Sequence, residues 1–287
     1  MNELVIKDIE NRIQKHKYGE CIYHYTSIPV LYNILKNKEF WLGSTATMND
    51  SKEVKYFIEL IRDELRKEIY TKISSDKLNQ FDAFFDNVIK RIDKEYPYAM
   101  CFSKLKDDAA QWERYADGGK GVCIVLNTRK FMRIFYETHI LFNNVYYDFD
   151  VKKHSHYRVL YDYFTTGQLR DFSDEKGQVD NAIACGYVHK HRSFTSEQEI
   201  RMVNLWNHIP KYAKVKTECI SGIIKRVMKI DVEKRCVEAG VSFEDIFEGI
   251  IIGPKSRQDI FSLKSYIEEC GYIDLKDKVS KSDCPLR

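Results

Sequence analysis

Short apolar segments of strand length alternate along this chain with longer segments whose apolar residues recur at helical spacing. Strands are predicted where β-branched and aromatic residues cluster and then stop at a polar residue or glycine, at 21–25, 98–102, 122–126, 200–205 and 247–252. Helices are predicted where apolar residues follow a period of 3.6, among them 29–37, 155–170, 176–191, 232–239 and 256–270. This interleaving predicts an α/β (α+β) fold with a central mixed sheet.

The longest helical pattern covers residues 51–95, and a break at Ser74-Ser75 divides it into two helices. We interpret this segment as a helical insertion between strands. The chain has only 5 proline and 13 glycine residues, and it contains no linker-like stretch and no repeat. We therefore expect one domain over residues 1–287 that carries the insertion 51–95.

Composition excludes several classes of protein. With 44% hydrophobic and 31% charged residues, the chain can form a sizeable core and is not of the disordered type. A net charge of +3 is too small to indicate nucleic-acid binding by itself. No apolar run approaches the roughly 20 residues of a membrane span, and the first residues lack the apolar core of a signal peptide. We expect a cytoplasmic protein without a membrane partner.

The 8 cysteines show no C-x-x-C pair and no close Cys/His spacing. Two of them, Cys101 and Cys123, lie inside apolar strand patterns, where a free thiol packs like a small apolar side chain. The pattern predicts reduced thiols and no metal site.

The first candidate site is His24-Tyr25-Thr26-Ser27, at the end of a predicted strand. A neutral imidazole can exchange a hydrogen bond with a sugar hydroxyl, and the ring of Tyr25 can stack on a flat ligand. From these residues alone, a structural histidine is the favoured interpretation.

The second candidate is Glu197-x-Glu199-x-Arg201, which enters a predicted strand. Strand alternation would place all three side chains on one face, with Arg201 keeping its neighbouring carboxylate ionised. Such a group can bind ribose hydroxyls and stabilise the positive charge that develops as a glycosidic bond breaks. A solvated polar face on an edge strand is the alternative.

The third candidate is Asp117-Gly118-Gly119-Lys120-Gly121, a loop that could contact a phosphate through its backbone or could be a plain turn before a strand. It matches neither the P-loop nor the Rossmann pattern. Asn49 and Asp50 could contribute polar groups to a cleft or cap the next helix. Trp112 and Tyr115, one helical turn apart, could form an aromatic wall or pack in the core.

Several of these segments together resemble the bacterial family catalogued as domain of unknown function 2971, from about residue 21 to the C-terminus. The motifs that carry the resemblance are Y-H-Y-T-S (23–27), N-D-x-x-E (49–53), C-F-S (101–103), W-x-x-Y-A-D-x-x-K-G-V-C-I (112–124), S-E-Q-E-I-R (196–201), I-I-G-P-K-S (251–256) and S-x-S-x-x-P-x-R (280–287). They occur in this order and are specific as a set.

That family is in turn similar, more remotely, to ADP-ribosyltransferases. The resemblance implies that His24 and Thr26 bind a ribose of NAD, that Ser103 or Tyr115 lies near nicotinamide, and that Glu199 is the catalytic carboxylate. Glu197 would orient the incoming nucleophile. Gly119-Lys120-Gly121 is similar to a G-K-G stretch of the poly-ADP-ribosylating branch, but Cys123 stands where that branch has a stacking tyrosine. The candidates for the stacking ring are Tyr25, Trp112, Tyr115 and Tyr147.

The function implied is transfer of ADP-ribose from NAD to a macromolecular acceptor, nucleic acid or protein. The family context is that of bacterial toxin–antitoxin or phage-defence systems, in which an antitoxin protein would be a partner. Two alternatives remain at this point. One is a non-catalytic module of the same fold that binds a nucleotide or a partner, and the other is an NAD glycohydrolase.

Overall fold

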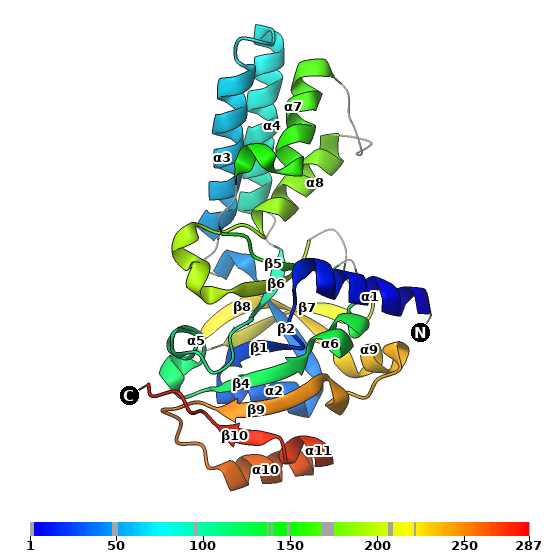
Figure 1. Ribbon diagram of the computed structural model, residues 1–287, viewed down its shortest axis with the longest axis vertical. Coiled ribbons are helices and arrows are strands. Elements are labelled where there is room, and N and C mark those ends of the chain that lie inside the picture. Colours follow the sequence, from blue (N-terminus) through cyan, green and yellow to red (C-terminus); the bar gives the residue numbers. More distant parts are fainter. Residues whose placement is uncertain are drawn as a thin grey trace. The chain divides into compact units, whose positions relative to one another are not determined.

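The computed structural model describes residues 3–47, 51–94, 97–136, 138, 140–147, 150–167, 175–205, 209–220 and 222–286 (Figure 1). Its helices are α1 (Glu3–His16), α2 (Ile28–Asn37), α3 (Ser51–Ile69), α4 (Ser75–Lys94), α5 (Ala109–Tyr115), α6 (Thr128–Ile134), α7 (Ser155–Thr166), α8 (Glu175–Gly186), α9 (Val232–Ala239), α10 (Ile260–Glu269) and α11 (Ile273–Lys276). Short 3₁₀ turns include η2 (Asp117–Gly119) and η4 (Arg192–Glu197).

The strands are β1 (Cys21–Thr26), β2 (Glu39–Ser44), β3 (Tyr98–Ser103), β4 (Val122–Asn127), β5 (Ile140–Asn144), β6 (Glu199–Asn204), β7 (Ala213–Ile220), β8 (Ile223–Asp231), β9 (Phe247–Ile252) and β10 (Val279–Lys281). They form one mixed sheet of ten strands, in which β10 pairs with β9 in parallel and the neighbouring pair of β4 and β9 is antiparallel. The predicted α/β class with a central mixed sheet is confirmed.

The chain divides into two compact units. The sheet unit comprises residues 1–43, 98–144 and 196–287, and the helical unit comprises 44–97 and 145–195. The sequence predicted one domain with an insertion at 51–95, but that segment supplies only half of the helical unit. Residues 145–195 join it, because the apolar faces of α3 and α4 need a second pair of helices to cover them.

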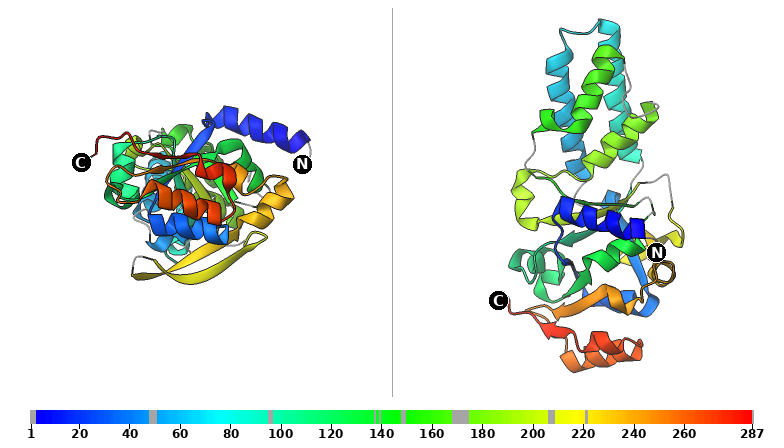
Figure 2. Two further views of the ribbon diagram at one scale, coloured as in Figure 1. Left: turned by 90° about the horizontal axis from the view of Figure 1, so that it is seen from below. Right: turned by 45° about the vertical axis from the view of Figure 1, so that its right-hand side comes forward.

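In the helical unit, α3, α4, α7 and α8 lie side by side (Figure 2). The ring of Phe164 on α7 contacts Phe81 and Phe84 of α4, with ring centroids 5.0 and 5.7 Å apart. On the same helix bundle, Arg91 forms a 2.8 Å ion pair with Asp180 of α8. The ring contacts show that the apolar face of α4 is buried against α7.

In the sheet unit, the order of strands is β10-β9-β4-β1-β3-β2-β8-β7, and β6 adds to β3. One face of this sheet packs into the main apolar core. Buried side chains of helices α1, α2, α6, α9, α10 and α11 complete that core. The rings of Tyr32 on α2 and Tyr266 on α10 stack on each other, with their centroids 4.6 Å apart. The opposite face is covered in part by α5.

Within the described residues, no helix is both long enough and apolar enough to cross a lipid bilayer. All eight cysteines are free thiols, and the described residues contain no group of three or more His, Cys, Asp or Glu side chains positioned for a metal ion.

Candidate functional site

Strands of the sheet unit bring the candidate motifs to one end of the sheet. The last residue of β1, Thr26, pairs with Val122 at the start of β4, and Val122 pairs with Ile252 at the end of β9. The last residue of β3, Ser103, pairs with Glu199 at the start of β6. Segments that are far apart in the sequence therefore meet at this end, where α5 also lies (Figure 1).

The register decides which candidates share a face, because paired residues in a sheet point to the same side. Tyr23 pairs with Ser103, which pairs with Glu199, and Cys101 pairs with Arg201. These side chains lie on the face that α5 covers. His24 is one residue along from Tyr23 and points to the opposite face. The structure therefore does not bring His24 and Glu199 into one cleft.

His24 lies against the main core. Its ring contacts Phe102 at 5.6 Å, and Nδ1 lies 2.9 Å from the carbonyl oxygen of Cys101. Because a carbonyl can only accept, Nδ1 carries the proton and donates it. Burial lowers the pKa of His24, and the bond to Cys101 offsets part of that effect. These contacts favour the structural interpretation of this histidine over its predicted role at a ribose.

Glu199 and Arg201 form a buried, two-point ion pair. The Nε of Arg201 donates to Oε1 of Glu199 at 2.6 Å, and its terminal nitrogen donates to Oε2 at 2.9 Å. The two residues are only 6% and 2% exposed. Alternation along β6 places them on one face, as predicted, and the pairing offsets the cost of burying each charge.

Glu197 departs from the predicted strand pattern. It ends the turn η4, and the following residue, Gln198, has a positive φ of 42°, so the alternation begins only at Glu199. The carboxylate of Glu197 is buried and reaches α5 instead. There its Oε1 accepts from the hydroxyl of Tyr115 at 2.7 Å and from Arg114 at 3.2 Å. We call Arg114, Tyr115, Glu197, Glu199 and Arg201 the carboxylate cluster.

Two buried side chains position Glu197 through its backbone. The hydroxyl of Ser103 donates to the Glu197 carbonyl at 2.9 Å, and the side-chain amide of Gln111 donates to the same oxygen at 3.1 Å. Ser103 also accepts from the backbone N–H of Leu105 at 3.1 Å, so its hydroxyl both donates and accepts within the protein. Sequence reasoning missed Gln111 and Arg114. Gln111 follows Asp107 by four residues and Arg114 follows Gln111 by three, and this helical spacing was the available signal.

Tyr25 and Trp112 pack on each other, edge to face, with ring centroids 4.9 Å apart. Trp112 is fully buried and Tyr25 is 6% exposed, and both have bonded polar atoms. Neither ring is available to stack on nicotinamide, which corrects that expectation. Tyr147 belongs to the helical unit. Tyr115, at 45% exposed, is the remaining predicted stacking residue with an open ring in the sheet unit.

Gly121 allows a close approach of two backbone segments. A Cβ atom at this position would lie 2.1 Å from the carbonyl oxygen of Thr26 and 3.0 Å from that of Ala116. The neighbouring Gly253 donates its N–H to the Gly121 carbonyl at 2.9 Å. Thr26 itself is buried at 8% exposed. The predicted residues Asn49 and Asp50 lie outside the described residues.

Residues 111–202 match the family model described as Protein of unknown function (DUF2971). The resemblance to that family is confirmed. The matched range begins at Gln111 of α5 and ends in β6, so it contains the whole carboxylate cluster.

No curated protein and no solved structure matches the chain. The more remote similarity to ADP-ribosyltransferases therefore stays a prediction.

Proposed function

We propose that this protein transfers ADP-ribose from NAD to a macromolecular acceptor, with the carboxylate cluster as its reaction centre. The observation that carries the proposal is a pair of buried carboxylates, each with its own cation, beside a half-exposed tyrosine at the end of the sheet. A carboxylate oxygen held in a fixed orientation beside the breaking bond stabilises an oxocarbenium-like transition state.

In the proposed reaction, the bond between C1′ of the ribose and the nicotinamide nitrogen breaks, and nicotinamide leaves with the bonding electrons. Glu199 faces the developing positive charge at C1′ and accepts a hydrogen bond from the ribose 2′-hydroxyl. The acceptor nucleophile then forms a new bond to C1′, and Glu197 takes up the proton it loses. Tyr115 offers its ring to nicotinamide and its hydroxyl to Glu197.

His24 is not among the residues that contact NAD, because its side chain lies on the core face of the sheet. Arg201 acts as a positioning residue, since its two hydrogen bonds fix the orientation of the Glu199 carboxylate.

The test is release of nicotinamide from NAD by the wild type, Glu199→Gln and Glu199→Asp, with and without total bacterial RNA or cell lysate. We expect both variants to lose at least about a hundredfold in rate, as when a group that stabilises transition-state charge is removed. Glu199→Asp keeps a negative charge opposite Arg201, so its fold is retained even if that of Glu199→Gln is not. Glu248→Gln, which changes an exposed carboxylate on β9, should match the wild type.

Wild-type rates in both folded Glu199 variants would contradict the mechanism. The acceptor pool that increases release identifies the acceptor as nucleic acid or protein. Release that labels neither pool would make the protein an NAD glycohydrolase.

One observation favours a second candidate, a non-catalytic module that binds a nucleotide. Both oxygens of Glu199 already accept from Arg201, and the pair is buried. A carboxylate engaged in this way can be purely structural. Folded wild-type protein that releases no nicotinamide under any condition, yet binds a nucleotide, would support this candidate.

A further inference from the structure

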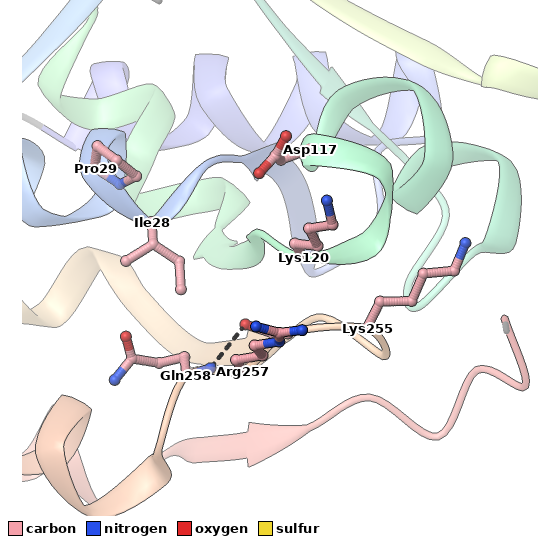
Figure 3. A pocket seen from close by; sticks show the side chains of 8 residues that line it. Ile28, Pro29, Asp117, Lys120, Lys255, Arg257 and Gln258 are labelled. Atoms are coloured by element: carbon pink, nitrogen blue, oxygen red, sulfur yellow. Dashed lines mark hydrogen bonds between the residues drawn. The ribbon is translucent and has the colours of Figure 1, made fainter.

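A pocket of about 610 Å³ opens in the sheet unit on the side of the β1 and β9 ends. It is lined by Ile28, Pro29, Asp117, Lys120, Lys255, Ser256, Arg257 and Gln258, and we call it the basic pocket. Figure 3 shows Asp117 and Lys120 extending from the loop after α5, Arg257 and Gln258 from the segment after β9, and Ile28 pointing between them. None of these side chains belongs to the carboxylate cluster.

The charges around the basic pocket are not balanced. Three cations, Lys120, Lys255 and Arg257, and one carboxylate, Asp117, line the pocket, which leaves an excess of two positive charges. Lys120 and Arg257 make no ion pair with any residue that the structure describes. Within the described part of the chain, Lys255 has only a long ion-pair contact of 3.5 Å, to the exposed carboxylate of Glu113. Like charges gathered without a partner repel one another, so an anionic ligand would stabilise this arrangement.

The two backbone segments that carry these cations lie close together and are joined by hydrogen bonds. The N–H of Lys255 donates to the Gly119 carbonyl at 2.9 Å, and Gly253 donates to Gly121 at the same distance. A Cβ on Gly253 would lie 2.4 Å from the oxygen of Gly119. Glycine is therefore needed at position 253 for this approach, and the contact places Lys120 beside Lys255 and Arg257 although about 135 residues separate them.

The start of α2 adds to the positive potential. Ile28 and Pro29 form its first turn, and the preceding Ser27 makes no side-chain bond to the helix amides. The N-terminus of a helix carries a partial positive charge that favours phosphate groups. Ile28 and Pro29 also give the pocket an apolar wall, and its volume is in the range that encloses a small organic ligand.

We propose that the basic pocket binds the diphosphate of a nucleotide, with the phosphate oxygens contacting Lys120 and Arg257 and the organic part against Ile28 and Pro29. Arginine and lysine are the side chains that bind phosphate most strongly, the first through paired N–H donors and the second as a compact charge. Asp117 can accept a hydrogen bond from a sugar hydroxyl. The proposal does not rest on the transferase reaction, since it concerns binding at a separate set of residues.

The experiment is calorimetric titration of the full chain with ADP, inorganic pyrophosphate and adenosine. We expect ADP and pyrophosphate to bind and adenosine not to bind, because the phosphates supply the attraction. Lys120→Gln and Arg257→Gln should each weaken ADP binding roughly tenfold, the effect of one charged hydrogen bond. Lys216→Gln, which changes an exposed lysine on β7, is the matched control and should bind like the wild type.

Three outcomes would overturn the proposal: no binding of ADP or pyrophosphate to the wild type, adenosine binding as tightly as ADP, or unchanged ADP affinity in the Lys120→Gln/Arg257→Gln double variant. Both substitutions are at exposed positions, so the variants should remain folded. Titration of Glu199→Asp separates this site from the proposed reaction centre. If Glu199→Asp still binds ADP and the wild type releases no nicotinamide, the proposal for the basic pocket stands and the proposed transferase reaction fails.

Discussion

The carboxylate cluster and the basic pocket belong to the same compact unit, but their charges are compensated differently. In the cluster, each carboxylate has a cation of its own chain as partner, and the Glu199–Arg201 pair is nearly inaccessible to solvent. In the basic pocket, Lys120 and Arg257 have no such partner among the described residues and face solvent.

This difference has a consequence for stability and for binding. Charges that are paired and buried contribute to the folded state, because removing one partner leaves the other without compensation. Charges that are exposed and unpaired contribute little to folding and remain available to a ligand. Substitutions in the cluster should therefore change the free energy of unfolding, whereas those in the basic pocket should change affinity.

The largest expected effect is that of Arg201→Met, which leaves the Glu199 carboxylate buried without its cation. We expect the free energy of unfolding to fall by about 3–5 kcal/mol, measured by urea denaturation at pH 7 with tryptophan fluorescence. The Glu199→Met/Arg201→Met double variant removes both charges and should recover most of this loss. An equal loss in the single and double variants would contradict the account of the ion pair.

Gly253→Ala should have an intermediate effect, because its new methyl group would overlap the carbonyl oxygens of Gly119 and Gly121. We expect a loss of about 1–3 kcal/mol together with weaker ADP binding, as the two segments of the basic pocket separate. Gly118→Ala is the control. It introduces a side chain at a positive φ of 62° but meets no atom within 4 Å, so its cost should be about 1 kcal/mol. Wild-type stability and affinity in Gly253→Ala would show that the close approach is unimportant.

The smallest effect is expected for Tyr115→Phe, which removes the hydroxyl that donates to Glu197. Because Arg114 still donates to the same carboxylate, the loss should be only about 0.5–1.5 kcal/mol in urea denaturation. Tyr32→Phe removes a hydroxyl from a similarly exposed ring, 43% against 45%, and should change stability by less than about 0.5 kcal/mol. If both variants behave alike, the bond between Tyr115 and Glu197 does not hold the cluster together.

Most elements could be predicted from the sequence, since a period of two or of 3.6 follows from which face of a segment is buried. The strands at β1, β3, β4, β6 and β9 and the helices α2 and α9 lie within one or two residues of their predicted bounds. The sequence missed α6, α11, β7 and β10. The last two have few buried residues, so their periodicity is weak, and α6 directly follows β4 without a turn between them.

Local sequence is enough to predict that Glu199 and Arg201 share a face, because both lie inside one strand. It also determined which segments carry polar residues at strand ends. Tertiary structure alone decided that His24 faces the core, since the face of a strand depends on its pairing register with strands far away in the chain. The backbone turn at Gln198, which directs Glu197 to α5, is likewise set by contacts that no local pattern records.

The basic pocket exists only because the fold brings residues that are distant in sequence together. Lys120 and Arg257 are distant in sequence, and each is an ordinary surface cation in its local context. They become neighbours because β4 and β9 pair antiparallel, which brings the segment before β4 next to the segment after β9, and Gly253 lets the two segments touch. Coulomb repulsion and attraction depend on distance in space, and so the chemistry of this pocket exists only in the folded chain.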